Sequence, residues 1–451
     1  MPAQPHTPPP AYFLSLSLEN VRSFGDKQTI SFARPDGRPA QWTIILGDNG
    51  VGKTTVLKAL AGMVAEKSFD EEMVDDKKIP KPALISLANT LWYPFRHGGE
   101  TGLTLSIDIC VIMPTGELFS MDQFRQINMT TKGQPNPGEM GYGGIFKKRP
   151  GINHQEPICY GYGAGRTVGN STLGEVSQLN KNYISLFDDR ADLLNPEEWF
   201  LQMEYSSLKQ DKQAGKALKQ VRQVLLQVLP DITDIRISSK GHQQFLELES
   251  PYGWVRLRDM SLGYQTLVVW LTDFASKLFI RYPDSPNPLE EPAIVLIDEI
   301  DLHLHPSWQR KLLDFLSDIF KNTQFIATAH SPLVVQAAGD QGANVVLLRR
   351  EGDQTVVVTD VEDVRGWRVD QILNSELFED VSTLSKQTEE DLARRNELLL
   401  KEQLTPTEEA KLAELNAKVA EAPIGDTPPE RRVESLLTRL ARNLKDDDLL
   451  H

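Results

Sequence analysis

Cysteine is scarce in this sequence, because its 451 residues include only two, Cys110 and Cys159. Two thiols are too few for a disulfide framework or for a zinc site of four thiolates. Long apolar runs are missing too, since no stretch of about 18 uninterrupted apolar residues occurs. The segment 1–10 is rich in proline and lacks the apolar core of a signal peptide, so we expect a disordered tail there. These absences predict a cytoplasmic protein without a membrane partner.

Basic residues are outnumbered by acidic ones, 48 to 63, which gives a formal net charge of −15. Such a charge excludes a surface that binds nucleic acid over its whole extent, so any nucleic-acid contact must be a local patch. One candidate patch consists of five basic residues at helical spacing: Lys209, Lys212, Lys216, Lys219 and Arg222. A solvated helix face is the commoner explanation for such a pattern.

The apolar pattern predicts an α/β fold with a largely parallel sheet. Strands are expected at 12–18, 29–32, 42–46, 103–111, 232–237, 244–248, 293–297, 324–328, 345–348 and 355–358. Helices are expected at 53–65, 196–228, 263–279 and 307–320. Segments 70–78 and 133–151 read as loops, because one is a mixed run of charges and the other is dense in glycine, proline and lysine. Strands that alternate with helices in this way indicate a parallel sheet.

The length allows about two or three domains, or one large domain with insertions. We assign 11–365 to one core domain with an insertion of helices and loops at about 66–255. The sequence from 366 to 451 is helical and rich in charge, which suits contacts with a partner or an oligomer. Thr405–Glu408 and Thr427–Glu430 both fit a capping box with proline in the first turn, so helices are expected at 386–403, 406–421 and 428–443.

A phosphate-binding loop follows the apolar strand at 42–46. The segment from 47 to 54 reads GDNGVGKT, a full match to the pattern of that loop. Glycines leave backbone N–H groups unhindered for phosphates, and the following helix adds a partial positive charge at its N-terminus. The predicted nucleotide-binding residues are Gly47, Asp48, Asn49, Gly50, Val51, Gly52, Lys53, Thr54 and Thr55.

An acidic pair, Asp298-Glu299, follows the apolar strand at 293–297. Carboxylates at the end of a buried strand are costly for stability but well placed for Mg²⁺ and water. We therefore expect Asp298 to bind Mg²⁺ with Thr54, and Glu299 to act as the general base. His330 follows the next apolar strand and can reach the γ-phosphate from there. Lys53 would contact the β- and γ-phosphates.

The order of these motifs resembles the ABC-type ATPase heads of the SMC/RecF branch. The resemblance rests on LGDNGVGKTT, MSLGYQ, AIVLIDEIDLHLHP and FIATAHSP, and on the opening segment LENVRSFGDKQTISF, and it covers about 12–350. It implies a P-loop core with an antiparallel β-subdomain and a helical lobe. It also implies ATP and Mg²⁺ as ligands, and a homodimer, or a higher oligomer, that sandwiches ATP between its heads.

In that family the signature motif of one head contacts the nucleotide of the other, and here Ser261 and Gly263 match it. Asp301 matches the loop between the subunits. Leu262 departs from the pattern, because it stands where the usual signature has its first glycine. The glutamine that couples nucleotide to lobe motion in the family has no assigned counterpart in this chain.

The segments GYGAGR, NPEEWFLQMEY and DEIDLHLHPSWQ look like the OLD-like AAA_21 group. In size and helical tail the chain resembles the ATPase subunits of Septu-type anti-phage systems, also found with some retrons, which work with a separate HNH-type nuclease. This resemblance implies a nucleotide-driven dimerisation switch that regulates a nuclease. Two alternatives stay open: a RecF-like repair ATPase that acts directly on DNA, and an ATP-gated scaffold with little turnover.

Two lesser features have competing interpretations. His303 and His305 lie just after the acidic pair, where a metal site is conceivable but subunit-contact or core histidines are the commoner case. Arg166 closes the segment GYGAGR, and a contact with nucleotide, a contact with a dimer partner and a structural ion pair are all compatible with its position.

Overall fold

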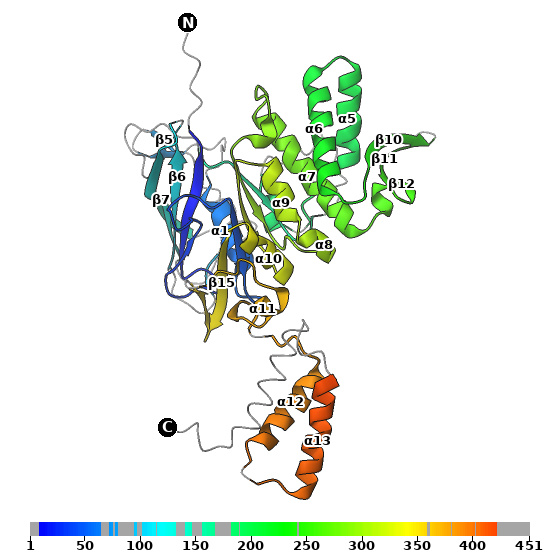
Figure 1. Ribbon diagram of the computed structural model, residues 1–451. Coiled ribbons are helices and arrows are strands. Elements are labelled where there is room, and N and C mark those ends of the chain that lie inside the picture. The colour runs from blue at the N-terminus through cyan, green and yellow to red at the C-terminus, as the bar shows by residue number, and fades with distance from the viewer. Residues whose placement is uncertain are drawn as a thin grey trace. The chain divides into compact units, whose positions relative to one another are not determined.

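A computed structural model gives the arrangement of the chain (Figure 1). It describes residues 9–64, 72–74, 77–79, 94–96, 102–113, 115–131, 140–146, 156–166, 182–188, 190–240, 243–358, 361–379, 381–401 and 403–421. The chain divides into two compact units, Met1–Ile372 and Leu373–His451. No helix among these described residues is long and apolar enough to span a membrane.

A six-stranded sheet forms the centre of the first unit, in the order β16-β15-β3-β14-β13-β9. Its strands are β3 (Trp42–Leu46), β9 (Cys159–Tyr162), β13 (Ala293–Ile297), β14 (Thr323–Thr328), β15 (Asn344–Glu351) and β16 (Gln354–Val358). All neighbours pair in parallel except β15 and β16. Every residue of β3, β9, β13 and β14 is buried, as expected for parallel strands covered on both faces. The sequence-based prediction of an α/β fold with a largely parallel sheet is confirmed.

A second, antiparallel sheet has the order β2-β1-β6-β7-β8. It contains β1 (Ala11–Glu19), β2 (Gln28–Ser31), β6 (Gly102–Ile112), β7 (Leu118–Thr131) and β8 (Met140–Phe146). Helix α1 (Lys53–Met63) shares one hydrophobic core with both sheets, and in Figure 1 it lies to the right of β6 and β7. Between α1 and β6 in the sequence, β4 (Glu72–Val74) and β5 (Lys77–Ile79) pair as a small antiparallel hairpin.

Helices α5 (Pro196–Leu208), α6 (Lys212–Val228) and α7 (Leu262–Arg281) form a helical lobe with the sheet of β10 (Asp234–Lys240), β11 (Gln243–Ser250) and β12 (Gly253–Arg256). The other helices of the first unit are α4 (Ile184–Phe187), α8 (Pro306–Gln309), α9 (Leu312–Ile319), α10 (Pro332–Asp340) and α11 (Val369–Leu373), which ends one residue beyond it. In the second unit, α12 (Lys386–Leu399) and α13 (Pro406–Glu421) pack together, with Leu415 fully buried.

Several sequence-based boundaries are wrong. The helix predicted at 196–228 is two helices, because Gln210 adopts a left-handed conformation and Asp211 caps α6 by accepting from Gln213 N–H and Ala214 N–H. The helix predicted at 307–320 is likewise divided into α8 and α9. The segments predicted as loops contain β4, β5 and β8, and the long strand β7 was not predicted.

The helices predicted at 386–403 and 406–421 are present as α12 and α13. The first capping box is present as well, because Glu408 Oε2 accepts from Thr405 N–H at 2.9 Å and Thr405 Oγ1 accepts from Glu408 N–H at 3.4 Å. The helix predicted at 428–443 and most of the predicted disordered tail at 1–10 lie outside the described residues.

Gln324 connects the two sheets through its side chain. Its amide oxygen accepts from Phe13 N–H at 2.9 Å, and its amide nitrogen donates to Phe13 C=O at 2.9 Å. Phe13 lies where the pairing of β1 with β6 shifts register, so these two backbone groups find their partner in β14. Since both residues are buried, the amide satisfies groups that water cannot reach.

We expect Gln324→Leu to lower the free energy of unfolding by about 2–4 kcal/mol, because it leaves a buried N–H and a buried C=O without partners. Chemical denaturation of the full chain measures this loss. Gln213→Leu, an exposed glutamine of α6, is the matched control and should change stability little. Equal stabilities for the two variants would contradict the assigned role of Gln324.

Candidate nucleotide-binding site

The loop between β3 and α1 has the conformation that its glycines permit. Gly47, Gly50 and Gly52 have φ angles of 134°, 82° and 96°. At Gly47 the chain also passes close to β15, since a Cβ there would lie 2.2 Å from Leu348 O. The loop leads into the N-terminus of α1, where free N–H groups and the helix dipole favour an anion.

Lys53 lies inside this loop. Its Nζ donates to Gly47 O at 2.6 Å and to Asp48 O at 2.8 Å, and the residue is only 7 % exposed. Burial lowers the pKa of Lys53, while the carboxylates of Asp298 and Asp48 act in the opposite direction. The ammonium group of Lys53 thus donates to two carbonyls. Phosphate oxygens are stronger acceptors, so the group is suited to bind them instead.

Asp298 is the centre of a network that connects α1, β13 and β14. Its Oδ2 accepts from Thr54 Oγ1 at 2.8 Å, and its Oδ1 accepts from Thr328 Oγ1 at 2.7 Å. The same Thr328 hydroxyl accepts from Glu299 N–H at 2.7 Å. The residues predicted to bind magnesium, Thr54 and Asp298, are therefore in direct contact. Thr328 was missed by the sequence analysis, although its position as the last residue of a buried strand was visible.

Glu299 and His330 lie at the same edge of the sheet. Glu299 has a φ of 49°, in the left-handed region that residues with a Cβ disfavour. His330 is exposed, and its N–H donates to Asp301 Oδ2 at 3.0 Å. Asp301 was predicted for the loop between subunits. Within this chain its carboxylate fixes the turn that carries His330.

A cavity of about 610 Å³ joins these groups, a size that suits a nucleotide. Nine of the residues around it come from the predicted motifs: Asn49, Gly50, Gly52, Lys53, Thr54, Thr55, Asp298, Glu299 and His330. The other three predicted loop residues do not border the cavity, but their carbonyls accept hydrogen bonds that stabilise the loop. Gly47 and Asp48 hold Lys53, and the carbonyl of Val51 accepts from Thr355 Oγ1 at 2.9 Å.

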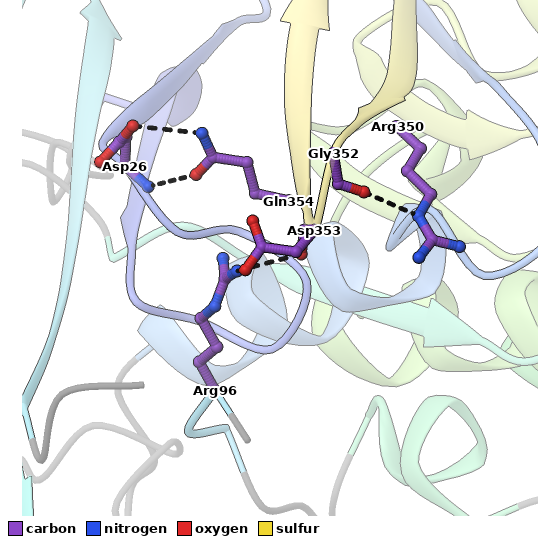
Figure 2. Close-up of polar contacts among 6 residues, drawn as sticks. All are labelled: Asp26, Arg96, Arg350, Gly352, Asp353 and Gln354. Carbon is purple, nitrogen blue, oxygen red and sulfur yellow. Dashed lines mark hydrogen bonds and ion pairs between the residues drawn. The ribbon is translucent and has the colours of Figure 1, made fainter. Parts of the chain in front are cut away.

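The rest of the cavity wall consists of Arg22, Ser23, Arg96 and Asp353, which the sequence analysis missed. Figure 2 shows Arg96 beside the turn between β15 and β16, where its Nη2 donates to Asp353 Oδ2 at 2.7 Å. In the same view Gln354 accepts from Asp26 N–H at 2.9 Å and donates to Asp26 Oδ2 at 3.1 Å. These contacts fix the turn against two distant segments. Of these four, Arg22 and Ser23 had a signal, because they lie in the opening segment LENVRSF.

Ser261 and Gly263 lie elsewhere, at the N-terminus of α7, and neither borders the cavity. Gly263 packs closely on the segment after the acidic pair, since a Cβ there would lie 2.6 Å from His303 O. Leu262 between them is 58 % exposed. Within one chain the signature and the cavity are therefore separate.

The two histidines after the acidic pair form no metal site with their neighbours. His305 Nδ1 contacts Ser307 Oγ at 2.8 Å, and His303 is exposed. Among the residues that the structure describes, no group of three or more His, Cys, Asp or Glu side chains is placed to hold a metal ion. Arg166 does not border the cavity, and its terminal nitrogens donate to backbone carbonyls.

Family comparisons agree with this site. Residues 171–336 match the AAA_21 family, "AAA domain, putative AbiEii toxin, Type IV TA system", and residues 15–85 match the AAA_23 family, "AAA domain". The fold and the phosphate-binding loop are those of a P-loop nucleotide-binding core, and both family matches are to AAA domains.

Several individual proteins are similar to this chain over part of its length. The chain is 26% identical to "Septu protein PtuA" of Bacillus mycoides (strain KBAB4) over 366 residues, which cover 80% of this chain and 44% of that protein. It is 36% identical to "Retron Ec83 probable ATPase" of Escherichia coli over 135 residues, 30% of this chain and 24% of that one. The matched part thus spans less than half the length of either relative.

The SMC head in "Crystal structure of the SmcHead bound to the C-winged helix domain of ScpA" has a TM-score of 0.40 at 16% identity, covering 77% of this chain and 97% of that one. In sequence the chain is thus similar to a Septu protein and, over a shorter stretch, to a probable retron ATPase.

We expect Lys53→Ala to weaken binding of ATP by roughly 10- to 100-fold, because it removes a charge-assisted hydrogen bond to phosphate. Isothermal titration with a non-hydrolysable ATP analogue measures the change. Lys58→Ala, on the same helix but outside the cavity, is the matched control and should bind like the parent chain. Unchanged affinity in Lys53→Ala would remove Lys53 from the phosphate site.

Proposed function

We propose that this chain binds ATP with Mg²⁺ in the cavity, hydrolyses it, and acts as a nucleotide-driven dimerisation switch for a partner effector. The observation that carries the proposal is the convergence of Lys53, Thr54, Asp298, Glu299 and His330 on one cavity. These residues come from three separate strand ends, and each supplies a group that phosphoryl transfer needs.

Each group has a definite role. Lys53 and the loop N–H groups bind the β- and γ-phosphates, with His330 at the γ-phosphate. Glu299 accepts a proton from water as the water oxygen bonds to the γ-phosphorus and the bond to the β–γ bridging oxygen breaks. The products are ADP and inorganic phosphate. We place the ribose and base beside Arg22 and Arg96, which also border the cavity.

Thr54 and Asp298 fit a magnesium ion. They offer one hydroxyl and one carboxylate in contact at 2.8 Å, and Mg²⁺ in nucleotide sites commonly uses one or two such ligands beside phosphate oxygens and water. When bound, the ion neutralises charge on the phosphates. A cluster of three carboxylates is not needed for this chemistry.

Dimerisation follows from the position of the signature. Ser261 is exposed at the N-terminus of α7, a helix of 20 residues, and lies away from the cavity of its own chain. A helix N-terminus with a free hydroxyl is suited to a phosphate. In the proposed dimer, Ser261 and Gly263 of one chain close the nucleotide site of the other, and Leu262 packs at the boundary.

The proposed effector is a separate nuclease of the HNH type in bacterial anti-phage defence. Similarity to a Septu protein and to a retron ATPase supports this context. We assign the contact with the effector to the helical region 366–451, whose described helices carry many charges and few buried side chains. ATP-dependent closure of the heads would then control the effector.

We expect Glu299→Gln to reduce steady-state ATP hydrolysis by about 100- to 10,000-fold, the usual contribution of a general base, with little loss of ATP binding. Phosphate release from the full chain measures turnover. Glu290→Gln, a carboxylate that pairs with Lys321 at the surface, is the control and should hydrolyse ATP normally. Normal turnover in Glu299→Gln would exclude Glu299 as the base.

We expect Glu299→Gln with ATP and Mg²⁺ to form a stable dimer, since binding proceeds and release by hydrolysis is blocked. Adding Ser261→Arg should prevent this dimer, because a large side chain replaces the small hydroxyl at the shared site. Light scattering after size exclusion measures the mass with and without ATP. The proposed switch is wrong if the mass is the same under all these conditions.

A further inference from the structure

Arg166 lies directly behind the acidic pair. It follows β9 by four residues, and β9 pairs in parallel with β13, so the two strands end side by side. Asp298 N–H donates to Tyr162 O at 2.8 Å, which continues this pairing past the end of β13. The guanidinium then donates twice, from Nη1 to Asp298 O at 2.9 Å and from Nη2 to Glu299 O at 2.8 Å.

These two bonds hold a turn that its own residues disfavour. Glu299 has a left-handed φ of 49°, which crowds the Cβ of any residue other than glycine. Asp298 and Glu299 both border the cavity, while their backbone carbonyls accept from Arg166, which does not. The planar fork of an arginine offers two donors in a fixed geometry to two successive carbonyls, whereas a lysine offers one ammonium group on a flexible stem.

Arg166 also places a positive charge beside the two acids. It is 5 % exposed, and burial lowers its pKa to about 10, with Asp298, Glu299 and Asp301 acting in the opposite direction. It therefore keeps its charge at neutral pH. Since it does not border the cavity, it does not touch the nucleotide.

We propose that Arg166 is a positioning residue for the hydrolytic step: its fork fixes the Asp298–Glu299 backbone so that the Glu299 carboxylate faces the attacking water. This inference rests on the proposed ATPase reaction. It distinguishes Arg166 from a general stability residue, because its effect should fall on turnover and leave ATP binding nearly unchanged.

Arg125 provides a matched control. It is another buried arginine, 2 % exposed, which donates to Met63 O at the end of α1 and forms an ion pair with Glu156 at 3.0 Å. It lies on β7 and does not border the cavity. Arg125→Ala should therefore lower thermal stability without a selective effect on the turnover of the folded protein.

The experiment uses full-length Arg166→Ala, Arg166→Lys and Arg125→Ala. For Arg166→Ala we expect kcat to fall by about 10- to 100-fold, as is typical when a residue that orients a functional side chain is removed. The affinity for an ATP analogue should stay within about threefold of the parent. Guanidinium ion, far below denaturing concentration, should raise the kcat of Arg166→Ala and leave that of Arg125→Ala unchanged. Arg166→Lys keeps charge and bulk, so it should fold and show an intermediate kcat.

Normal kcat in both Arg166 variants would overturn the inference, as would a loss of ATP binding that matches the loss of turnover. If Arg166→Ala does not fold, Arg166→Lys decides by the same two measurements. Glu299→Gln is assayed in parallel. Normal turnover there overturns the proposed reaction itself, whereas an inactive Glu299→Gln beside active Arg166 variants overturns only the role of Arg166.

Discussion

The Asp298 carboxylate is the contact on which the site depends, because it connects three parts of the chain that are far apart in sequence. Its two oxygens accept from Thr54 on α1 and from Thr328 on β14, while Asp298 itself directly follows β13. Parallel strands end at the same edge of a sheet, so the loops after β3, β13 and β14 meet there. A buried carboxylate is stable only when its oxygens are bonded, so the same bonds that shape the site also make the acidic residue tolerable inside the fold.

Local motifs explain why the catalytic part of this site is readable from sequence. The loop at 47–54 and the acidic pair each lie within a few consecutive residues, and each follows a short strand that is mostly or wholly apolar. The pairing of β3, β14 and β13 then brings them together, and the alternation of strands and helices predicts that pairing. Thr328 has the same origin, yet a threonine that ends a strand is too common to be recognised without its partners.

Contacts between distant segments are what the sequence does not reveal. Arg96 meets Asp353 only because the hairpin of β15 and β16 folds back beside the opening segment of the chain. In the insertion after α1, the strand predicted at 103–111 is β6, whereas β7 and β8, which extend the same sheet, were not predicted. Strand β7 has polar residues between apolar ones, and β8 is rich in glycine, so neither has the continuous apolar pattern that made β13 visible. The break between α5 and α6 depends on one residue, Gln210, in an unusual conformation.

The cations and acids of the cavity already have partners within the chain. Lys53 donates to two loop carbonyls, Thr54 to Asp298, and Arg96 to Asp353. Nucleotide phosphates and their magnesium ion would compete for these same donors, so binding exchanges existing hydrogen bonds for stronger, charge-assisted ones. Only the difference between the two sets is available as binding energy. Because the released groups belong to α1, β13 and the β15–β16 turn, occupation of the cavity changes the contacts that hold these elements together. A site built in this way would sense a bound nucleotide through the surrounding fold, as the proposed dimerisation switch requires.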